Sequence, residues 1–570
     1  MNAERLLVNY EKIDNAPHAI ERLRRFILDL AVRGKLVPQN KNDEPASELL
    51  KRIAKEKARL FDAGNIRMPK PIPALAEASF PIPASWQWSQ LAEIGLLSPR
   101  NDAPDTFDSS FVPMTLIAAE YGVANQHEVR PWGEIKKGYT HFAEGDVGLA
   151  KITPCFENGK SAVFRGLTGG IGSGTTELHI VRPIYVNPDY ILLFFKSPHY
   201  IESGIPKMTG TAGQKRVPTE YFAHSSFPLP PLAEQRRIVA KVDELMGLCD
   251  RLEAARGSRE AARDRLAAAS LARLNAPDPE TFQVDARFAL DALPALTTRP
   301  NQIKQLRETV LSLAVRGKLV PQDNNDEPAS ELLKRIAKEK DRQVEAGIIR
   351  APKPIPALVE ASFPIPASWQ WSQLAEIGIL SPRNDAPDTL ATSFVPMTLI
   401  AAEYGVANQH EVRPWGDIKK GYTHFAEGDV GLAKITPCFE NRKSAVFRNL
   451  TGRIGSGTTE LHVVRPIYVD PAYILLFLKS PHYIETGIPK MTGTAGQKRV
   501  PTEYFAHSPF PLPPLAEQHR IVAKVNALMT LCDRLEASLT ATAATRRRLL
   551  DALLAEALMP ADARELEAAE

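Results

Sequence analysis

The stretch KMTGTAGQKRVPTEYF occupies residues 207–222 and recurs, letter for letter, at residues 490–505, a displacement of 283 positions. Two further segments recur at the same displacement, AVRGKLVPQ at 31–39 and 314–322, and ASWQW at 84–88 and 367–371. A constant displacement needs no gap in the alignment. The chain therefore consists of two tandem copies of one unit, with short ends.

The composition fits a soluble globular protein. A chain of 570 residues has room for about three or four domains, but the repeat reduces this to two kinds of domain, each present twice. Hydrophobic residues make up 44% of the sequence, and no apolar run approaches the ~20 residues that span a bilayer. Residues 1–15 lack the apolar core of a secretory signal, so we expect a cytoplasmic protein without a membrane partner.

Charge and cysteine usage exclude little by themselves. The net charge of +3 is too small to indicate a nucleic-acid partner, so any such partner must be argued from local patches. The four cysteines form no CxxC motif and no Cys/His cluster (Cys155, Cys249, Cys438 and Cys532). We therefore predict reduced thiols and no metal site.

Each copy begins with a helical part. Ile20, Leu23, Ile27 and Leu30 are spaced by 3, 4 and 3 residues, which places one apolar stripe on a helix, and a second helix is predicted over 46–60. A proline-rich segment then excludes further helix and marks a domain boundary (Pro69, Pro71, Pro73, Pro81 and Pro83).

The middle part of each copy has short apolar runs separated by glycines and turn signals, which predicts a mixed α/β globular domain. Taken together, the signals predict an α+β protein in five segments. These are a helical region at 1–75, a globular domain at 76–230, a central region at 231–365 with a long helix, a linker and a second helical segment, a second globular domain at 366–513, and a final helix at 514–570.

The third part of each copy begins at PLPPLAEQ (228–235) and carries an apolar heptad pattern. The predicted seam consists of Ile238, Val242, Leu245, Cys249 and Leu252 in the first copy and of Ile521, Val525, Leu528, Cys532 and Leu535 in the second. Two such helices in one chain favour pairing with each other as a coiled coil. The alternative is that each helix docks on its own globular domain.

No enzyme signature is present, and we predict no catalytic residue. GTAGQK at 210–215 departs from the phosphate-binding loop because its glycines are too close and Arg216 follows the lysine. The sequence contains no HExxH, no GxSxG elbow, no GxGxxG opening a helix, and no NPP[FY] tetrapeptide of the kind that amino-methyltransferases use.

Two tracts suit nucleic acid instead. Residues 207–216 combine three cations with threonine hydroxyls, a glutamine and two glycines, which suits phosphate contacts and an adenine edge. Residues 148–165 place cations around a Pro/Gly turn beside predicted strands. The alternatives are a solvated basic loop for the first tract and a polar hairpin loop for the second. The candidate DNA-binding residues are Lys151, Asn158, Lys160, Lys207, Thr211, Gln214, Lys215 and Arg216, with Lys434, Asn441, Arg442, Lys443, Lys490, Thr494, Gln497, Lys498 and Arg499 in the second copy.

The order of globular domain, PLPPLAEQ helix, globular domain and second such helix resembles the specificity subunits of type I restriction–modification systems. GDVGLAKITPCFENGKSA (145–162), GTAGQKRVP (210–218) and LAVRGKLVPQ (30–39) carry the resemblance, which covers essentially the whole chain. It implies a subunit without catalytic activity whose two target-recognition domains each read one half of a split double-stranded DNA site. It also implies an antiparallel coiled coil that sets the spacing.

The same resemblance implies partners. Two adenine-N6 methyltransferase subunits would dock on the helices and would hold S-adenosylmethionine, so that this chain itself carries no cofactor. Motor–nuclease subunits would complete the restriction enzyme. The alternatives are a stand-alone DNA-modifying enzyme and a scaffold that binds only protein.

One feature is particular to this chain. Residues 84–235 and 367–518 agree at about nine positions in ten, so both domains should prefer the same half-site. With antiparallel helices the copies would be related by pseudo-two-fold symmetry, which predicts an interrupted palindrome. Gly159, Gly166 and Gly170 become Arg442, Asn449 and Arg453, through surface drift or through gained phosphate contacts.

Overall fold

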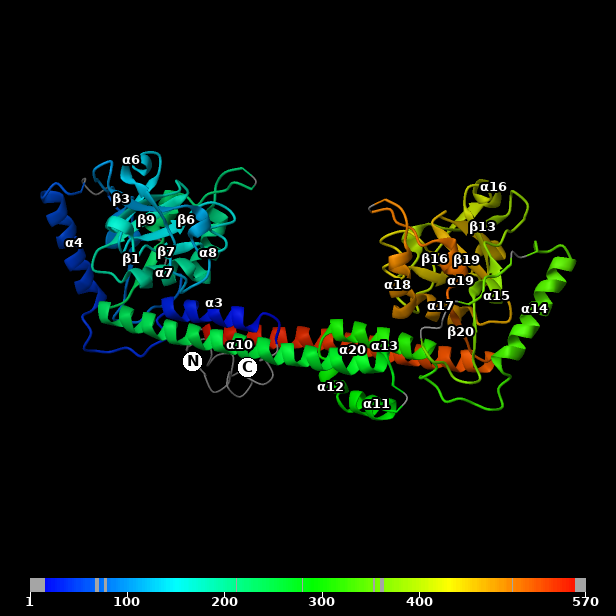
Figure 1. The fold of residues 1–570 in the computed structure, drawn as a ribbon. Helices are drawn as coiled ribbons and strands as arrows, with labels where there is room; N and C mark the ends of the chain where they lie inside the picture. Colours follow the sequence, from blue (N-terminus) through cyan, green and yellow to red (C-terminus); the bar gives the residue numbers. More distant parts are fainter. Residues whose placement is uncertain are drawn as a thin grey trace. The chain divides into compact units, whose positions relative to one another are not determined.

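The computed structural model describes residues 16–66, 71–75, 79–211, 213–278, 280–351, 354–358, 363–494 and 496–558. The chain divides into two compact units, drawn with the colours of the sequence in Figure 1. Unit 1 comprises Met1–Ser258 and Ala543–Glu570, and unit 2 comprises Arg259–Thr542. No helix in the described part of the chain combines the length and the apolar character needed to cross a membrane.

The helical part of unit 1 forms as predicted. The apolar stripe lies on α3 (Ala19–Val32), where Ile27 and Leu30 are buried. In α4 (Ala46–Asp62) only Ala46, Leu49 and Ile53 are buried, a single stripe at helical spacing. Of the prolines predicted to end the helices, Pro71, Pro73, Pro81 and Pro83 lie outside any helix or strand, and Pro69 falls outside the described residues.

The globular domain of unit 1 contains three antiparallel or mixed sheets, with strand orders β2-β9-β6-β7, β4-β3-β8-β5 and β1-β10. The bounds of its elements are β1 Gln87–Gln90, α5 Leu91–Ile94, β2 Gly95–Leu97, β3 Asp108–Val112, η1 Met114–Leu116, β4 Glu128–Pro131, α6 Trp132–Ile135, β5 Thr140–Ala143, β6 Val147–Ala150, β7 Ser161–Val163, η2 Thr168–Gly170, β8 Ile171–Gly174, β9 Leu178–Pro183, α7 Pro188–Lys196, α8 Pro198–Gly204, η3 Ile205–Lys207, α9 Thr219–His224 and β10 Ser226–Leu229. The strands predicted around 145–151, 161–165 and 178–181 are β6, β7 and β9.

Strand β6 lies between two apolar clusters, which explains its short, fully apolar sequence. Val147 and Leu149 pack into the cluster around α7, whereas Ala150 joins a second cluster on the other face, because successive side chains of a strand alternate. Gly148 faces Phe164, and a Cβ atom there would lie 2.7 Å from that ring. The glycine therefore permits close packing in the layer between the two sheets.

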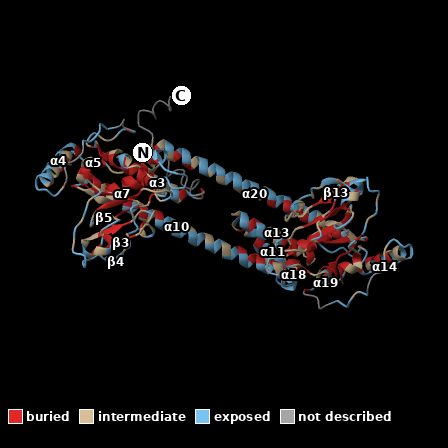
Figure 2. Ribbon diagram, turned by 90° about the horizontal axis from the view of Figure 1, so that it is seen from above, coloured by how far each residue is buried: buried red, intermediate tan, exposed pale blue. Residues whose placement is uncertain are grey.

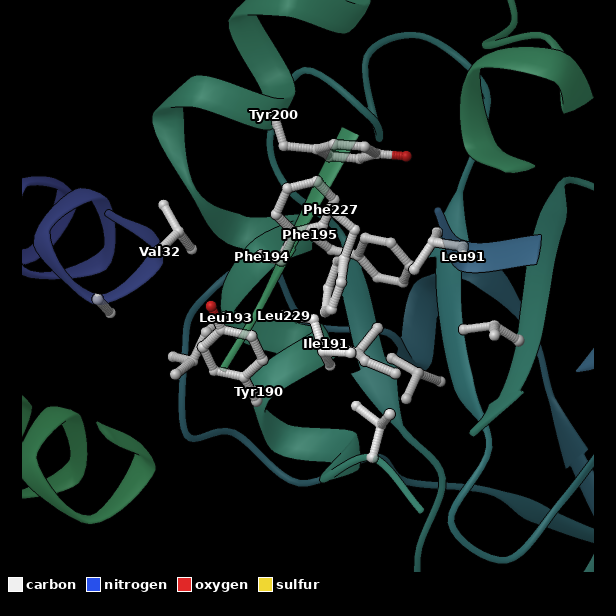
Figure 3. Close-up of a cluster of buried hydrophobic side chains, with 14 of the residues drawn as sticks. Val32, Leu91, Tyr190, Ile191, Leu193, Phe194, Phe195, Tyr200, Phe227 and Leu229 are labelled. Carbon is white, nitrogen blue, oxygen red and sulfur yellow. The ribbon is translucent and has the colours of Figure 1, made fainter. Parts of the chain in front are cut away.

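Helix α7 supplies much of the larger cluster. Asn187 caps its first turn by accepting a hydrogen bond from Asp189 N, and Pro188 occupies the first helical position, where proline is tolerated. Figure 3 shows Tyr190, Phe194 and Phe195 of α7 with Phe227 of β10, all buried.

Helix α10 (Leu232–Asn275) starts directly after PLPP, as the sequence predicts. Its seam residues Ile238, Val242 and Cys249 are buried in the core of their own globular domain, and Leu245 packs against that core. Leu252 remains 38% exposed. The first part of α10 thus docks on its own domain, the alternative arrangement for these seam residues, and pairing of α10 with the second long helix stays a prediction.

Unit 2 repeats this architecture, with sheets β12-β19-β16-β17, β14-β13-β18-β15 and β11-β20. Ile521 and Val525 again lie in the core of their own domain, Leu528 packs against it, Cys532 is buried and Leu535 is half-buried. Figure 2 colours the interior of each globular domain as buried. The element bounds are α11 Phe282–Asp291, α12 Leu293–Leu296, α13 Pro300–Val315, α14 Ala329–Glu345, β11 Gln370–Ser372, α15 Leu374–Ile377, β12 Gly378–Leu380, β13 Ala391–Val395, η4 Met397–Leu399, β14 Glu411–Pro414, α16 Trp415–Ile418, β15 Thr423–Ala426, β16 Val430–Ala433, β17 Ser444–Val446, η5 Thr451–Arg453, β18 Ile454–Gly457, β19 Leu461–Pro466, α17 Pro471–Lys479, α18 Pro481–Gly487, η6 Ile488–Lys490, α19 Thr502–His507, β20 Phe510–Leu512 and α20 Leu515–Leu558.

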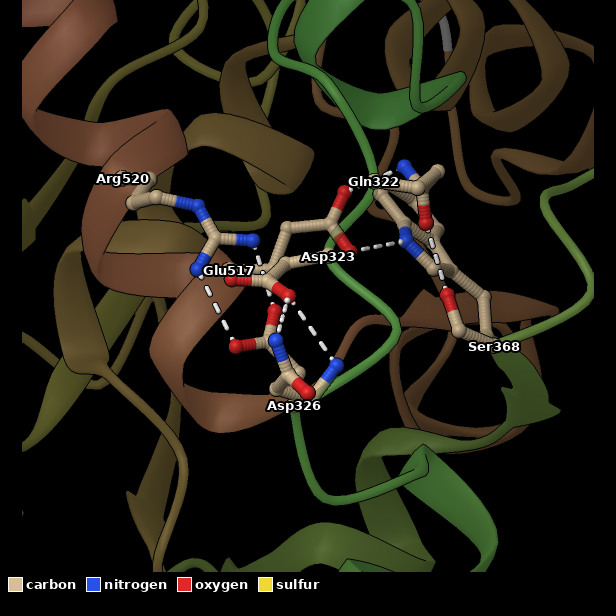
Figure 4. A network of polar contacts seen from close by, with 8 residues as sticks. Gln322, Asp323, Asp326, Ser368, Glu517 and Arg520 are labelled. Atoms are coloured by element: carbon tan, nitrogen blue, oxygen red, sulfur yellow. Dashed lines mark hydrogen bonds and ion pairs between the residues drawn. The ribbon is translucent and has the colours of Figure 1, made fainter.

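A polar network fastens the start of α20 to the loop after α13 (Figure 4). The buried carboxylate of Glu517 accepts hydrogen bonds from Gln322 Nε2 at 2.6 Å and from Trp369 Nε1 at 2.9 Å. Arg520 forms an ion pair with Asp326 at 2.6 Å. Burial raises the pKa of Glu517. These contacts join the repeated LVPQ, ASWQW and LAEQ motifs of unit 2.

Candidate nucleic-acid interface

The tract at 207–216 forms an exposed hairpin in unit 1. Thr209 and Arg216 exchange backbone hydrogen bonds of 3.0 and 2.8 Å, and Gln214 N donates to Thr211 O at 3.0 Å to close the tip. Gly210 has φ +128°, and a Cβ atom there would lie 2.7 Å from Gln214 O. The tip therefore requires glycine at this position.

The second tract lies directly beside the hairpin. Thr153 N donates to Lys215 O at 2.9 Å, Val217 N donates to Lys151 O at 2.8 Å, and Thr153 Oγ1 donates to Gly213 O at 3.1 Å. The two stretches treated as separate candidates in the sequence thus form one composite surface. The sequence carries no local signal for this pairing, because it joins residues about sixty positions apart.

The composite surface presents several free polar groups. Lys207, Thr211, Gln214 and Lys215 are exposed, and no ion pair engages either lysine within the described residues. Asn158 is exposed on the neighbouring turn. The side chains of the hairpin thus offer two ammonium groups, a hydroxyl and an amide, which suit phosphate oxygens and a base edge.

Arg216 is held in an ion pair, and its contact with DNA stays a prediction. Its guanidinium forms two-pronged hydrogen bonds with Glu177, with Nη2 to Oε1 at 2.7 Å and Nε to Oε2 at 3.0 Å. Arg216, with Lys151 nearby, lowers the pKa of Glu177. Arg216 therefore anchors the base of the hairpin, and its charge is already paired.

Lys160 and a residue that the sequence reasoning missed, Lys196, hold the turn of the second tract. Lys160 Nζ donates to Met114 O at 3.1 Å. The buried amine of Lys196, at the end of α7, donates to the carbonyl oxygens of Ala119 at 2.8 Å and Gly159 at 3.0 Å. Burial lowers the pKa of Lys196 to about 7. No motif signals this lysine, because its role depends on where the fold places α7.

Unit 2 builds the same surface. Thr436 N donates to Lys498 O at 2.9 Å, and Val500 N donates to Lys434 O at 2.8 Å. Arg499 pairs with Glu460 at 2.8 Å, and Lys443 Nζ donates to Met397 O at 3.1 Å. Asn441, Lys490, Thr494, Gln497 and Lys498 are exposed, like their counterparts in unit 1.

The arginine gained in the second copy is engaged in an ion pair within unit 2, and its contact with DNA stays a prediction. Arg442 forms an ion pair with Glu308 of α13 at 2.8 Å and is only 23% exposed. In unit 1 the position of Glu308 holds Arg25, which pairs with Glu202 of α8 at 2.7 Å. The Gly159-to-Arg442 difference is therefore matched by a change of charge sign from Arg25 on α3 to Glu308 on α13. Arg453 is exposed, so the alternative of a gained phosphate contact stays open there.

The described residues hold no group of three or more His, Cys, Asp or Glu side chains that could bind a metal ion. What the fold defines is a tandem-repeat protein in which two nearly identical α+β domains each present a basic hairpin and each lead into a long helix.

Comparison with known proteins gives the family. The chain is 37% identical to the type I restriction enzyme EcoAI specificity subunit of Escherichia coli, over 94% of this chain and 93% of that protein. It is 38% identical to the EcoEI specificity subunit of the same species, over 95% and 94%. The chain belongs to the family of type I restriction enzyme specificity subunits, the non-catalytic DNA-recognition subunits of these enzymes. No family model matches the chain.

Two solved structures are also similar. One concerns the assembly and conformational transition of a type I restriction–modification system, with TM-score 0.47, 18% identity, and coverage of 86% of this chain and 99% of that chain. The other is the HsdS subunit from Thermoanaerobacter tengcongensis, with TM-score 0.44, 20% identity, and coverage of 84% and 98%.

Proposed function

We propose that each recognition domain binds one half of a bipartite DNA site through the composite surface of hairpin and turn, and that both halves have the same sequence. The observation that carries this is the position of the differences between the copies. Residues 207–222 and 490–505 are identical, and the exposed candidates Asn158 and Asn441 also match. Equal side chains on equal backbones read equal bases.

We further propose that the half-sites are inverted. Helix α10 begins in unit 1 and its last residues belong to unit 2, whereas α20 begins in unit 2 and its last residues belong to unit 1. This reciprocal membership supports antiparallel helices and a pseudo-two-fold axis, a symmetry that matches an interrupted palindrome. Each helix has 44 residues, about 66 Å at ~1.5 Å per residue, which is long enough to act as a ruler between half-sites.

A chain in which the second recognition domain is made identical to the first tests the equality of the half-sites. The differences between residues 84–235 and 367–518 would be converted to the first-copy residues, which also requires Glu308→Arg because Arg442 is lost. We expect the recognised sequence to stay the same. A change in one half of the site would show that the domains read different bases.

The partners are proposed from the family. Two methyltransferase subunits dock on the long helices and hold S-adenosylmethionine, and motor–nuclease subunits complete the assembly. The purified chain should not methylate DNA alone and should direct methylation when the methyltransferase subunit is added. Methylation by the chain alone would indicate a stand-alone enzyme. Failure to shift DNA even with that subunit would indicate a protein scaffold.

A further inference from the structure

The ends of the two long helices have diverged far more than the recognition domains. Residues 259–275 and 542–558 agree at fewer than half of their positions, against about nine in ten for the domains. Both ends make contacts that the structure describes, since the end of α20 packs on α3 within unit 1 and the end of α10 packs beside α11, α12 and α13 within unit 2.

In unit 1 the side chains at the start of α3 are small, and those at the end of α20 that pack on them are large. Ala19, the first residue of α3, and Ala16 just before it form a buried cluster with Leu550 and Leu553 of α20. Arg22 of α3 forms an ion pair with Asp551. One turn further along α3, Phe26 and its neighbours bury Ala557.

In unit 2 the sizes are reversed. The positions of Ala16 and Ala19 hold Arg299 and Gln302, and the positions of Leu550 and Leu553 hold Ala267 and Ser270, both buried. Arg299 forms an ion pair with Asp264 of α10, and Gln302 Nε2 donates to the same carboxylate at 3.2 Å. Large polar side chains therefore stand at the start of α13, and the end of α10 offers them small side chains at Ala267 and Ser270 and a carboxylate at Asp264.

The crossed combinations fit poorly. An α20-type end on α13 would bring Leu550 and Leu553 against Arg299 and Gln302, and Arg547 would replace Asp264 opposite Arg299. That combination overpacks the contact and sets like charges together.

An α10-type end on α3 would set Ala267 and Ser270 against Ala16 and Ala19 and leave a void, while Arg22 would face Ala268. The ion pairs Arg25–Glu202 and Glu308–Arg442 have opposite charge signs on α3 and α13. They add selectivity where each of these helices packs on the globular domain of its own unit.

We propose that the two contacts are mutually selective. Helix α3 packs with the end of α20 and not with that of α10, whereas α13 packs with the end of α10 and not with that of α20. A chain whose recognition domains are nearly interchangeable then closes in a single register. The recognition domains can be nearly identical because the residues that make the two packing contacts different lie at the helix ends.

Hydrogen exchange of the full chain tests the proposal. Asp264→Arg, Ala267→Leu and Ser270→Leu together give α10 an α20-type end. We expect amide exchange in residues 264–275 and 300–312 to rise by about tenfold or more, with residues 19–30 and 547–558 unchanged as an internal control. Adding Arg299→Ala and Gln302→Ala gives α13 the small face of α3, and protection should return.

The reciprocal pair of variants uses the other contact. Arg547→Asp, Leu550→Ala and Leu553→Ser should loosen the end of α20, and adding Ala16→Arg and Ala19→Gln should restore it. Recovery in the combined variants separates mismatch from a helix that no longer forms. The proposal would be wrong if the variants of α10 or α20 alone kept wild-type protection, or if the combined variants were no better protected than these.

Discussion

Removing the ammonium group of Lys215 isolates the electrostatic part of recognition in one domain. The side chain is exposed, while the backbone carbonyl of Lys215 holds the hairpin by accepting from Thr153 N. Lys215→Ala should therefore leave the hairpin folded and remove one phosphate contact. The same reasoning applies to Lys498, whose carbonyl accepts from Thr436 N.

The expected magnitude follows from counterion release. Each lost phosphate contact reduces the slope of log affinity against log salt by about 0.9, so either substitution alone should reduce it by about 0.9 and both together by about 1.8. Fluorescence anisotropy on a duplex carrying the site, with the methyltransferase subunits present and salt varied from about 50 to 200 mM, measures the slope.

A matched control removes the same charge elsewhere. Lys51 on α4 is exposed and pairs with Glu48 at 2.8 Å, so Lys51→Ala should leave the slope unchanged. Equal effects at Lys215 and Lys498 are required because the two surfaces are copies. An unchanged slope, or an effect at only one of the two lysines, would refute the assignment of this surface to DNA.

Three further outcomes are expected. Gly210→Ala places a Cβ atom 2.7 Å from Gln214 O at φ +128°, which should distort the tip of the hairpin and weaken DNA binding. The strain should cost ~1–3 kcal/mol and be measured as faster hydrogen exchange in residues 207–216. Normal DNA binding by this variant would argue against a role for the tip. Lys196→Met should flatten the dependence of stability on pH. The pKa of about 7 in the folded protein lies below that of lysine in the unfolded chain, so the unfolded state binds more protons between about pH 7 and 10 and wild-type stability rises over that range. Urea unfolding at several pH values would give the same pH dependence for wild type and variant if the amine were not buried. Glu517→Gln keeps one acceptor oxygen but sets its amide N–H against the N–H donor of either Trp369 or Gln322, so it should cost about 1–3 kcal/mol of stability. Glu517→Ala removes both acceptors and should cost more, and thermal stability equal to wild type in both variants would contradict the network in Figure 4.

The exact repeat explains how much of the fold could be predicted. A 283-residue displacement without gaps predicts two copies of each element of the globular domains, and local patterns located α3, α4 and the start of α10. These features depend on neighbours within a few turns or on backbone restrictions such as proline. The coiled-coil seam was harder, because a heptad pattern records that a face is apolar and does not record what covers it. Ile238 and Val242 are covered by their own domain.

For the candidate surface, too, local sequence patterns predicted part of the structure and contacts between distant residues decided the rest. Composition picked out both tracts, and the structure places them side by side. Composition did not reveal that Arg216 is held by Glu177, or that Lys196 supports the turn from inside the domain. Both depend on contacts between residues 37 or more positions apart, for which a single sequence carries no local signal.

Sequencing the methylome of cells that express this chain with its methyltransferase subunit tests the central claim most directly. Two nearly identical recognition domains on antiparallel helices predict that every methylated site consists of one half-site, a spacer of fixed length, and the same half-site inverted. Methylated sites built from two unrelated half-sites would contradict it.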